Sequence, residues 1–99
     1  MTTFDFGNGL VPAHQHSNGG GWVADTATVS ETAYVGPNAV VFDDAVVSGY
    51  ARVYGNAKVY DNARVSDNAK VTGYAKVFGD AVVSGDALVV GYAKVDGNG

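Results

Sequence analysis

The sequence predicts an all-β fold in which the chain winds as a three-sided parallel β-helix. Valine occupies every sixth position from Val23 to Val95, without a break. Alanine stands two residues before each valine from Ala27 to Ala93. The spacing of six matches no helix face, and β-branched valine with glycine at many turns opposes a helix. A bend in each hexad makes three hexads one triangular coil of 18 residues, so the repeat holds about four coils.

Residues 1–21 precede the repeat and are expected to form an N-terminal cap and linker, with the β-helix over 22–99. A solenoid exposes the core and the backbone edge of its first coil unless another segment covers them. The sequence Gly7-Asn8-Gly9 predicts a turn, and residues 17–21 read as a flexible joint. The apolar residues that we expect to cover the first coil are Phe4, Phe6, Leu10 and Val11.

Each hexad then supplies one short strand and one turn, as in Val53-Tyr54-Gly55-Asn56-Ala57-Lys58. Strand alternation points alanine and valine inward and the residue between them outward. Pairs such as Gly-Asn tolerate left-handed backbone angles and turn the chain. Small and medium side chains suit a narrow prism, where larger ones would collide. The predicted core is Val23, Val29, Val35, Val41, Val47, Val53, Val59, Val65, Val71, Val77, Val83, Val89 and Val95.

The repeat, clearest in residues 35–41 (VGPNAVV), resembles the hexapeptide-repeat family of left-handed parallel β-helices over residues 22–98. That resemblance implies the left hand of the coil, which the spacing alone does not determine. It also implies packing of copies side by side, with a homotrimer favoured. The leading segment, from Phe4 to Val23, is similar to short uncharacterised hexapeptide-repeat proteins of tailed phages and prophages. The second resemblance brings no activity with it.

Composition excludes several classes of function. The 99 residues carry a formal charge of −4 and no cysteine, so disulfides and Cys-ligated zinc are excluded. The charge is −5 over residues 1–51 and +1 over 52–99, without the basic stripe of a nucleic-acid binder. No apolar run reaches the roughly 20 residues of a membrane span. We expect a cytoplasmic or virion-associated protein that binds no membrane, no nucleic acid directly and no cofactor.

A stacking period of 18 divides the outward positions into columns. Successive residues of one column lie about 4.8 Å apart along the solenoid. One face combines apolar residues with a column of lysines at 58, 76 and 94. Two interpretations of its apolar stripe stay open. The rings stabilise neighbouring coils by stacking on one another, or the stripe is a protein–protein contact. The stripe comprises Trp22, Val40, Phe42, Tyr60 and Phe78.

At one corner of the predicted coil, aspartates at 25, 43 and 61 form a column beside those at 44 and 80. Aspartate at such positions commonly bonds the backbone of its own turn, and a calcium ion between the carboxylates is the alternative. His14-Gln15-His16 is a second candidate site. Alternation along an extended segment would put both imidazoles on one side, where three chains could bring six to one metal ion.

The sequence therefore favours a non-catalytic structural or protein-binding solenoid, oligomeric and phage- or prophage-associated. The alternative is a small acidic inhibitor of a host or anti-phage defence protein, which could mimic nucleic acid. A third hypothesis is an acyltransferase-like enzyme, as many hexapeptide proteins are. It is disfavoured because no loop interrupts the coils to hold a substrate and both histidines precede the first coil. We predict no catalytic residue.

Overall fold

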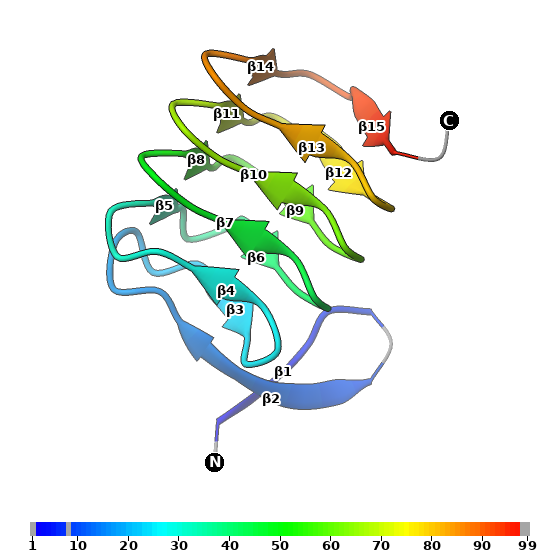
Figure 1. Cartoon of the computed structure of the whole chain (residues 1–99). Helices are drawn as coiled ribbons and strands as arrows, with labels where there is room; N and C mark the ends of the chain where they lie inside the picture. The colour runs from blue at the N-terminus through cyan, green and yellow to red at the C-terminus, as the bar shows by residue number, and fades with distance from the viewer. Residues whose placement is uncertain (1, 8, 98–99) are drawn as a thin grey trace.

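The computed structural model describes residues 2–7 and 9–97, and these form a three-sided β-solenoid of about four stacked coils (Figure 1). The described part measures 35 × 27 × 20 Å along its principal axes. It contains no helix that could cross a membrane. The predicted all-β coil of 18 residues is confirmed. The strands are β1 (Thr3–Asp5), β2 (Leu10–Gln15), β3 (Trp22–Ala24), β4 (Thr28–Val29), β5 (Tyr34–Val35), β6 (Val40–Val41), β7 (Val46–Val47), β8 (Arg52–Val53), β9 (Lys58–Val59), β10 (Arg64–Val65), β11 (Lys70–Val71), β12 (Lys76–Phe78), β13 (Val82–Val83), β14 (Leu88–Val89) and β15 (Lys94–Asp96).

Three sheets make the sides of the prism. The first face is β3-β6-β9-β12-β15, the second is β4-β7-β10-β13 and the third is β5-β8-β11-β14. Every pair of neighbouring coils within these faces is parallel and in register, as Val41 opposite Val59 and Val59 opposite Val77 illustrate. The register offset is 18 residues throughout, so a residue in one coil lies directly above its counterpart in the coil before.

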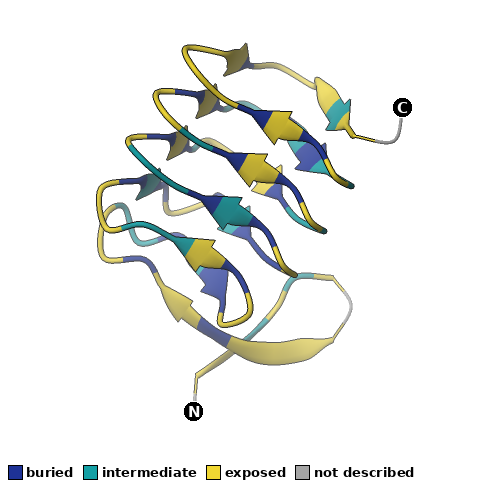
Figure 2. Ribbon diagram, viewed as in Figure 1, coloured by how far each residue is buried: buried dark blue, intermediate teal, exposed yellow. Residues whose placement is uncertain are grey.

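The core is a narrow column of valine and alanine along the solenoid axis. Figure 2 shows short buried stretches alternating with exposed ones around the coils. Val29 and Val95, in the first and last coils, are only partly buried because each has a coil on one side only. The fully buried side chains of largest volume are Val23, Val35, Val41, Val47, Val53, Val59, Val65, Val71 and Val77.

Successive turns are joined by the carboxylates of aspartates in the left-handed conformation. Asp43, Asp61 and Asp67 have φ angles of 58°, 59° and 59°. The side chain of Asp43 accepts a hydrogen bond from the amide of Asp61, and Asp61 accepts one from the amide of Gly79, at 3.3 and 3.1 Å. Our expectation that these carboxylates bond their own turns is therefore wrong. The coils lie close enough for each carboxylate to reach the next turn, 18 residues on.

The N-terminal segment closes the first face with an antiparallel hairpin. β1 pairs antiparallel with β2, and β2 pairs antiparallel with β3 through Ala13, His14 and Gln15. The backbone of β2 thus satisfies the edge of the first coil. Leu10 and Val11 do not cover the core as expected, since they are 71% and 39% exposed. Asn8, in the middle of the predicted turn, lies outside the described residues.

The glycine-rich stretch 17–21, expected to be a flexible joint, packs against the first coil. The amide of Gly21 donates to the carbonyl of Val35, and the amide of Val35 donates to the carbonyl of Asn18, at 3.0 and 3.1 Å. A Cβ on Gly19 would overlap the Val35 carbonyl, and the φ angle of Gly19 is 110°. Glycine is required here because the chain crosses the coil at backbone contact distance.

Candidate protein-binding face

A column of stacked rings runs along the outside of the first face. Phe42, Tyr60 and Phe78 stack in sequence, with ring centroids 4.9 and 5.3 Å apart and interplanar angles of 6° and 7°. Phe6 extends this aromatic column downward, stacking on Phe42 at 4.9 Å. The column position below Phe42 is held by Ala24, whose methyl group leaves room for the Phe6 ring. Stacking thus binds the N-terminal hairpin to the coils.

The remaining members of the predicted stripe join the aromatic column through the hairpin, where the rings of Phe4 and Phe6 lie 4.7 Å apart. Trp22 stacks with Phe4 at a centroid distance of 4.8 Å, and Val40 lies directly above Trp22 in the register. Phe42 is only 7% exposed, whereas Tyr60 and Phe78 are half-buried. Intramolecular stacking is therefore a function of the stripe, and the part left open to a partner is its upper half around Tyr60 and Phe78.

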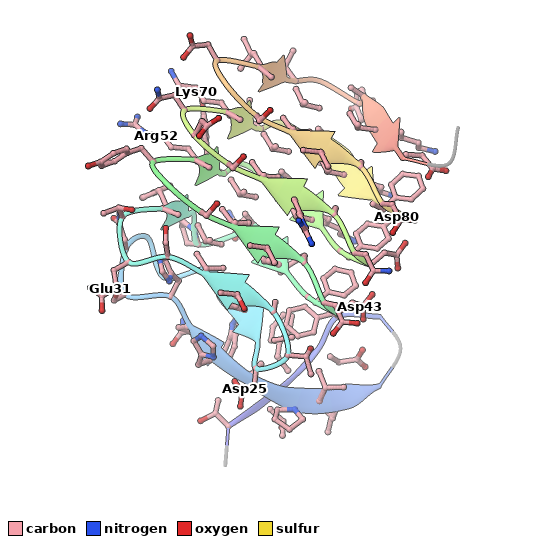
Figure 3. The ribbon with its side chains drawn as sticks, viewed as in Figure 1. Asp25, Glu31, Asp43, Arg52, Lys70 and Asp80 are labelled. Atoms are coloured by element: carbon pink, nitrogen blue, oxygen red, sulfur yellow. The ribbon has the colours of Figure 1, made fainter. Side chains whose placement is uncertain are left out.

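Opposite charges flank the aromatic column on its two sides. Lys58, Lys76 and Lys94 stand in register and form the lysine column. Lys58 and Lys76 lie two residues before the rings of Tyr60 and Phe78, and Lys94 lies two residues before Asp96. Aspartates follow the rings at the turn, forming the acidic corner. Figure 3 shows Asp43 and Asp80 at this corner beside a line of rings, with Arg52 and Lys70 on the other side of the solenoid. The acidic corner consists of Asp25, Asp43, Asp44, Asp61 and Asp80.

The two charged groups do not neutralise each other within the chain. Among the described residues, the ion pair within 4 Å is that of His14 with Asp25, at 2.7 Å. Lys58 is exposed and Lys76 half-buried, and neither contacts a carboxylate of the acidic corner. The first face thus presents a lysine column, apolar rings and a group of carboxylates in that order across its width, and Asp25 of that group is paired with His14.

The electrostatic environment of the aromatic column is visible at Tyr60. Burial raises the pKa of its phenol above the ordinary value of 10.0, and the carboxylates of Asp61, Asp96 and Asp43 raise it further. A neutral phenol is therefore maintained beside the acidic corner well into alkaline solution. Tyr60 acts as a neutral hydrogen-bonding group on the face.

Two hollows accompany this face. A groove of about 700 Å³ follows the acidic corner and is walled by Phe6, Val11, Pro12 and Phe42. A shallower hollow of about 230 Å³ lies between Lys58, Lys76 and Tyr60 on one side and Asp43 and Asp61 on the other. The second hollow marks the gap between the lysine column and the acidic corner.

The two histidines of the predicted pair bond different groups. The His14 ring bonds the carboxylate of Asp25 through Nδ1, with both side chains about half exposed. His16 is buried and its Nε2 donates to the carbonyl of Ala33 at 2.8 Å. β2 ends at Gln15, and the amide of His16 still donates to the carbonyl of Gly21 at 2.8 Å. The two imidazoles therefore have different partners within the chain, and a metal site that they share stays a prediction.

Within the described residues no three His, Cys, Asp or Glu side chains are placed to hold a metal ion. This search includes the acidic corner, whose carboxylates at Asp43 and Asp61 point along the solenoid to the next turn rather than toward a common centre. The geometry of that corner offers no support for the calcium alternative.

Comparison with known proteins agrees with the fold. Residues 57–73 match the family model described as the YdcK beta solenoid repeat. This stretch covers the third coil from β9 through β11. No curated protein and no solved structure matches the chain. The match supports membership of a solenoid repeat class and leaves the function to be inferred from the surface.

Sequence reasoning missed several exposed residues outside the first face. Tyr34, Tyr50, Tyr54 and Arg52 line a hollow of about 550 Å³ between the second and third faces. Tyr74 and Tyr92 stack at a corner, with centroids 5.1 Å apart. Tyr50, Tyr74 and Tyr92 occupy the turn position before alanine that elsewhere holds Asn, Asp or Thr, and this departure from the repeat was the available signal. Leu88 and Val90 are likewise exposed.

Proposed function

We propose that the chain is a non-catalytic structural and protein-binding module whose first face contacts another protein chain. The observation that carries the proposal is the combination of half-buried rings at Tyr60 and Phe78 with lysines on one side and aspartates on the other that do not pair with each other. Interface centres are enriched in aromatic residues with a polar rim, and the first face has that composition.

Several features support a role without catalysis. The coils follow one another without an inserted loop from β3 to β15, so no segment projects to enclose a substrate. The imidazole of His14 engages Asp25 at the surface, and that of His16 engages the backbone below the first coil. General-base chemistry needs an oriented base beside a bound substrate, and neither histidine lines a hollow found in the described residues.

The proposal extends to context. The resemblance of the leading segment to short phage and prophage proteins supports a phage-associated part, either in the bacterial cytoplasm or in the virion. The charge pattern of the first face supports self-association. The family resemblance implies a homotrimer, whereas the order of the charges across the face favours a pair of copies.

Lysine labelling tests whether the first face is the contact. Lys58 and Lys76 lie on that face, whereas Lys70 is exposed on the third face and serves as the internal control. We compare the acylation rate of each lysine at high dilution with its rate in concentrated solution or in a bacterial lysate. In the second condition, the rates of Lys58 and Lys76 should fall relative to that of Lys70. Equal labelling of all three lysines under every condition would contradict the proposed contact face.

A further inference from the structure

The first face is complementary to itself. A lysine column, an aromatic column and an acidic corner follow one another across its width. Lysine and aromatic positions lie two residues apart on the same strand, about 6.7 Å, and the acidic corner lies beyond the rings by one to two residues. The aromatic column is therefore near the midline between the two charged groups. With this order, the charged groups that face each other between two copies depend on whether the copies lie parallel or antiparallel.

We infer that the partner of the first face is a second copy of this chain, lying side by side and parallel, related by a twofold axis along the solenoid. This inference rests on the proposed function, namely that the first face is a protein contact. Rotation about that axis exchanges left and right without changing height along the solenoid. It therefore brings the lysine column of each copy against the acidic corner of the other.

Equal height determines which charges meet. Lys58 and Asp61 belong to one coil level, and Lys76 and Asp80 belong to the next. In the parallel pair, Lys58 faces Asp61 and Lys76 faces Asp80 of the other copy, so two kinds of ion pair each form twice. The aromatic columns meet between them, with Tyr60 and Phe78 opposite the same residues of the second copy. Apolar contact and charge pairing are satisfied together at these two levels, whereas at the level of Lys94 the column position of the rings is held by Asp96.

The antiparallel arrangement fails the same test. A twofold axis that runs across the face, perpendicular to the solenoid, places each column of one copy opposite the same column of the other. Lysines would then face lysines, and carboxylates would face carboxylates. Like charges placed across an interface destabilise it. The charge pattern thus selects the parallel direction.

The contact area that a stable pair needs is a small share of the accessible surface. A stable interface buries about 800 Å² on each partner, which is about 15% of the chain's 5242 Å² of accessible surface. Phe42 and the hairpin side chain Phe6 are already stacked in the free chain, so the central rings are fixed in place before association. Preorganisation lowers the entropy cost of binding.

A charge-exchange experiment tests this arrangement, with the dissociation constant measured by sedimentation equilibrium at low salt. Lys76→Asp and Asp80→Lys should each weaken the dimer by about tenfold, since each replaces two attractive contacts by repulsive ones. The double variant should return to within about twofold of the unmodified protein, because the exchanged charges again face each other. Lys70→Asp, on the third face, is the matched control and should leave the dimer unchanged.

Cross-linking reports the direction independently, since the chain contains no cysteine of its own. A mixture of Lys76→Cys protein and tagged Asp80→Cys protein should form a mixed dimer with a short bis-maleimide, whereas Lys76→Cys alone should not. A dimer whose double variant is not rescued, or one that cross-links through Lys76→Cys alone, overturns the parallel pair. So does a trimeric mass.

A monomeric mass at high concentration overturns the second copy as the partner. In that case, slowed labelling of Lys58 and Lys76 in a lysate would still support the proposed contact face, with a different protein as its partner. Uniform labelling of the lysines together with a monomeric mass would contradict both the proposed contact face and the second copy as its partner. Thermal melting of each variant verifies that loss of association is not loss of folding.

Discussion

The burial gradient along one column of valines predicts how the cost of a single substitution changes with position. Val59 lies in the middle of the first face's inner column with its side chain fully buried, whereas Val95 lies in the last coil and is partly exposed. Both residues have the same type, the same strand position and the same alanine neighbour two residues earlier. Val59→Ala and Val95→Ala are therefore matched variants that differ in packing alone.

The magnitude follows from the atoms removed. Val59→Ala deletes two buried methyl groups, worth about 1.6 kcal/mol of transfer free energy at about 0.8 kcal/mol each. The cavity left in a rigid coil adds about 1 kcal/mol, at roughly 24 cal/mol per Å³ over a volume of about 45 Å³. We expect a loss of about 2.5 kcal/mol of unfolding free energy. At Val95 solvent already reaches the side chain, and the loss should stay below about 1 kcal/mol.

Urea unfolding followed by circular dichroism measures both values, with the slope verifying that each variant unfolds as one unit. For a chain of this size, the Val59→Ala loss corresponds to a fall in melting temperature of roughly 10–20 °C. Equal losses at the two positions, or a larger loss at Val95, would refute the packing gradient. An unchanged stability in Val59→Ala would refute the valine core altogether.

Two further predictions concern the aromatic column. Phe6→Ala should lower the unfolding free energy by about 1–2 kcal/mol because Phe6 stacks on Phe42, while the control Leu10→Ala, at an exposed position of the same hairpin, should cost less than about 0.5 kcal/mol in the same urea assay. Equal costs would show that the ring does not anchor the hairpin. The pKa of Tyr60 is raised in the folded chain, so the unfolded chain loses this phenolic proton at lower pH than the folded one. The contribution of the Tyr60 phenol to stability is therefore complete below pH 10.0. It is lost as pH rises through the pKa of the folded state. Above pH 10.0 the free energy of unfolding should therefore fall less steeply with pH in Tyr60→Phe than in the unmodified protein. An ultraviolet titration in which Tyr60 ionises at its ordinary pKa would contradict this.

Predictions for the inward and stacked positions of the repeat are confirmed, whereas those for the N-terminal hairpin and for the aspartate side chains at the turns are wrong in part. The stacking of Phe42, Tyr60 and Phe78 follows from a fixed 18-residue offset, so it was open to prediction once the coil length was known. Phe6 lies outside the repeat, and its place on Phe42 depends on the path of the hairpin. The exposure of Leu10 has the same origin, because the backbone of β2, rather than its apolar side chains, covers the coil edge.

The sequence alone determined the solenoid, its coil of 18 residues and its inward valines, because a period of six with a bend in each hexad admits few other ways to bury one side of every strand. It also determined which outward residues share a column. Only the tertiary structure decided where the N-terminal residues go and which turn each aspartate side chain contacts. His16 turns under the first coil to meet Ala33, and the carboxylates of Asp43 and Asp61 reach the turn above rather than their own. Those contacts depend on the close approach of coils and hairpin, a distance that no local pattern of residues encodes.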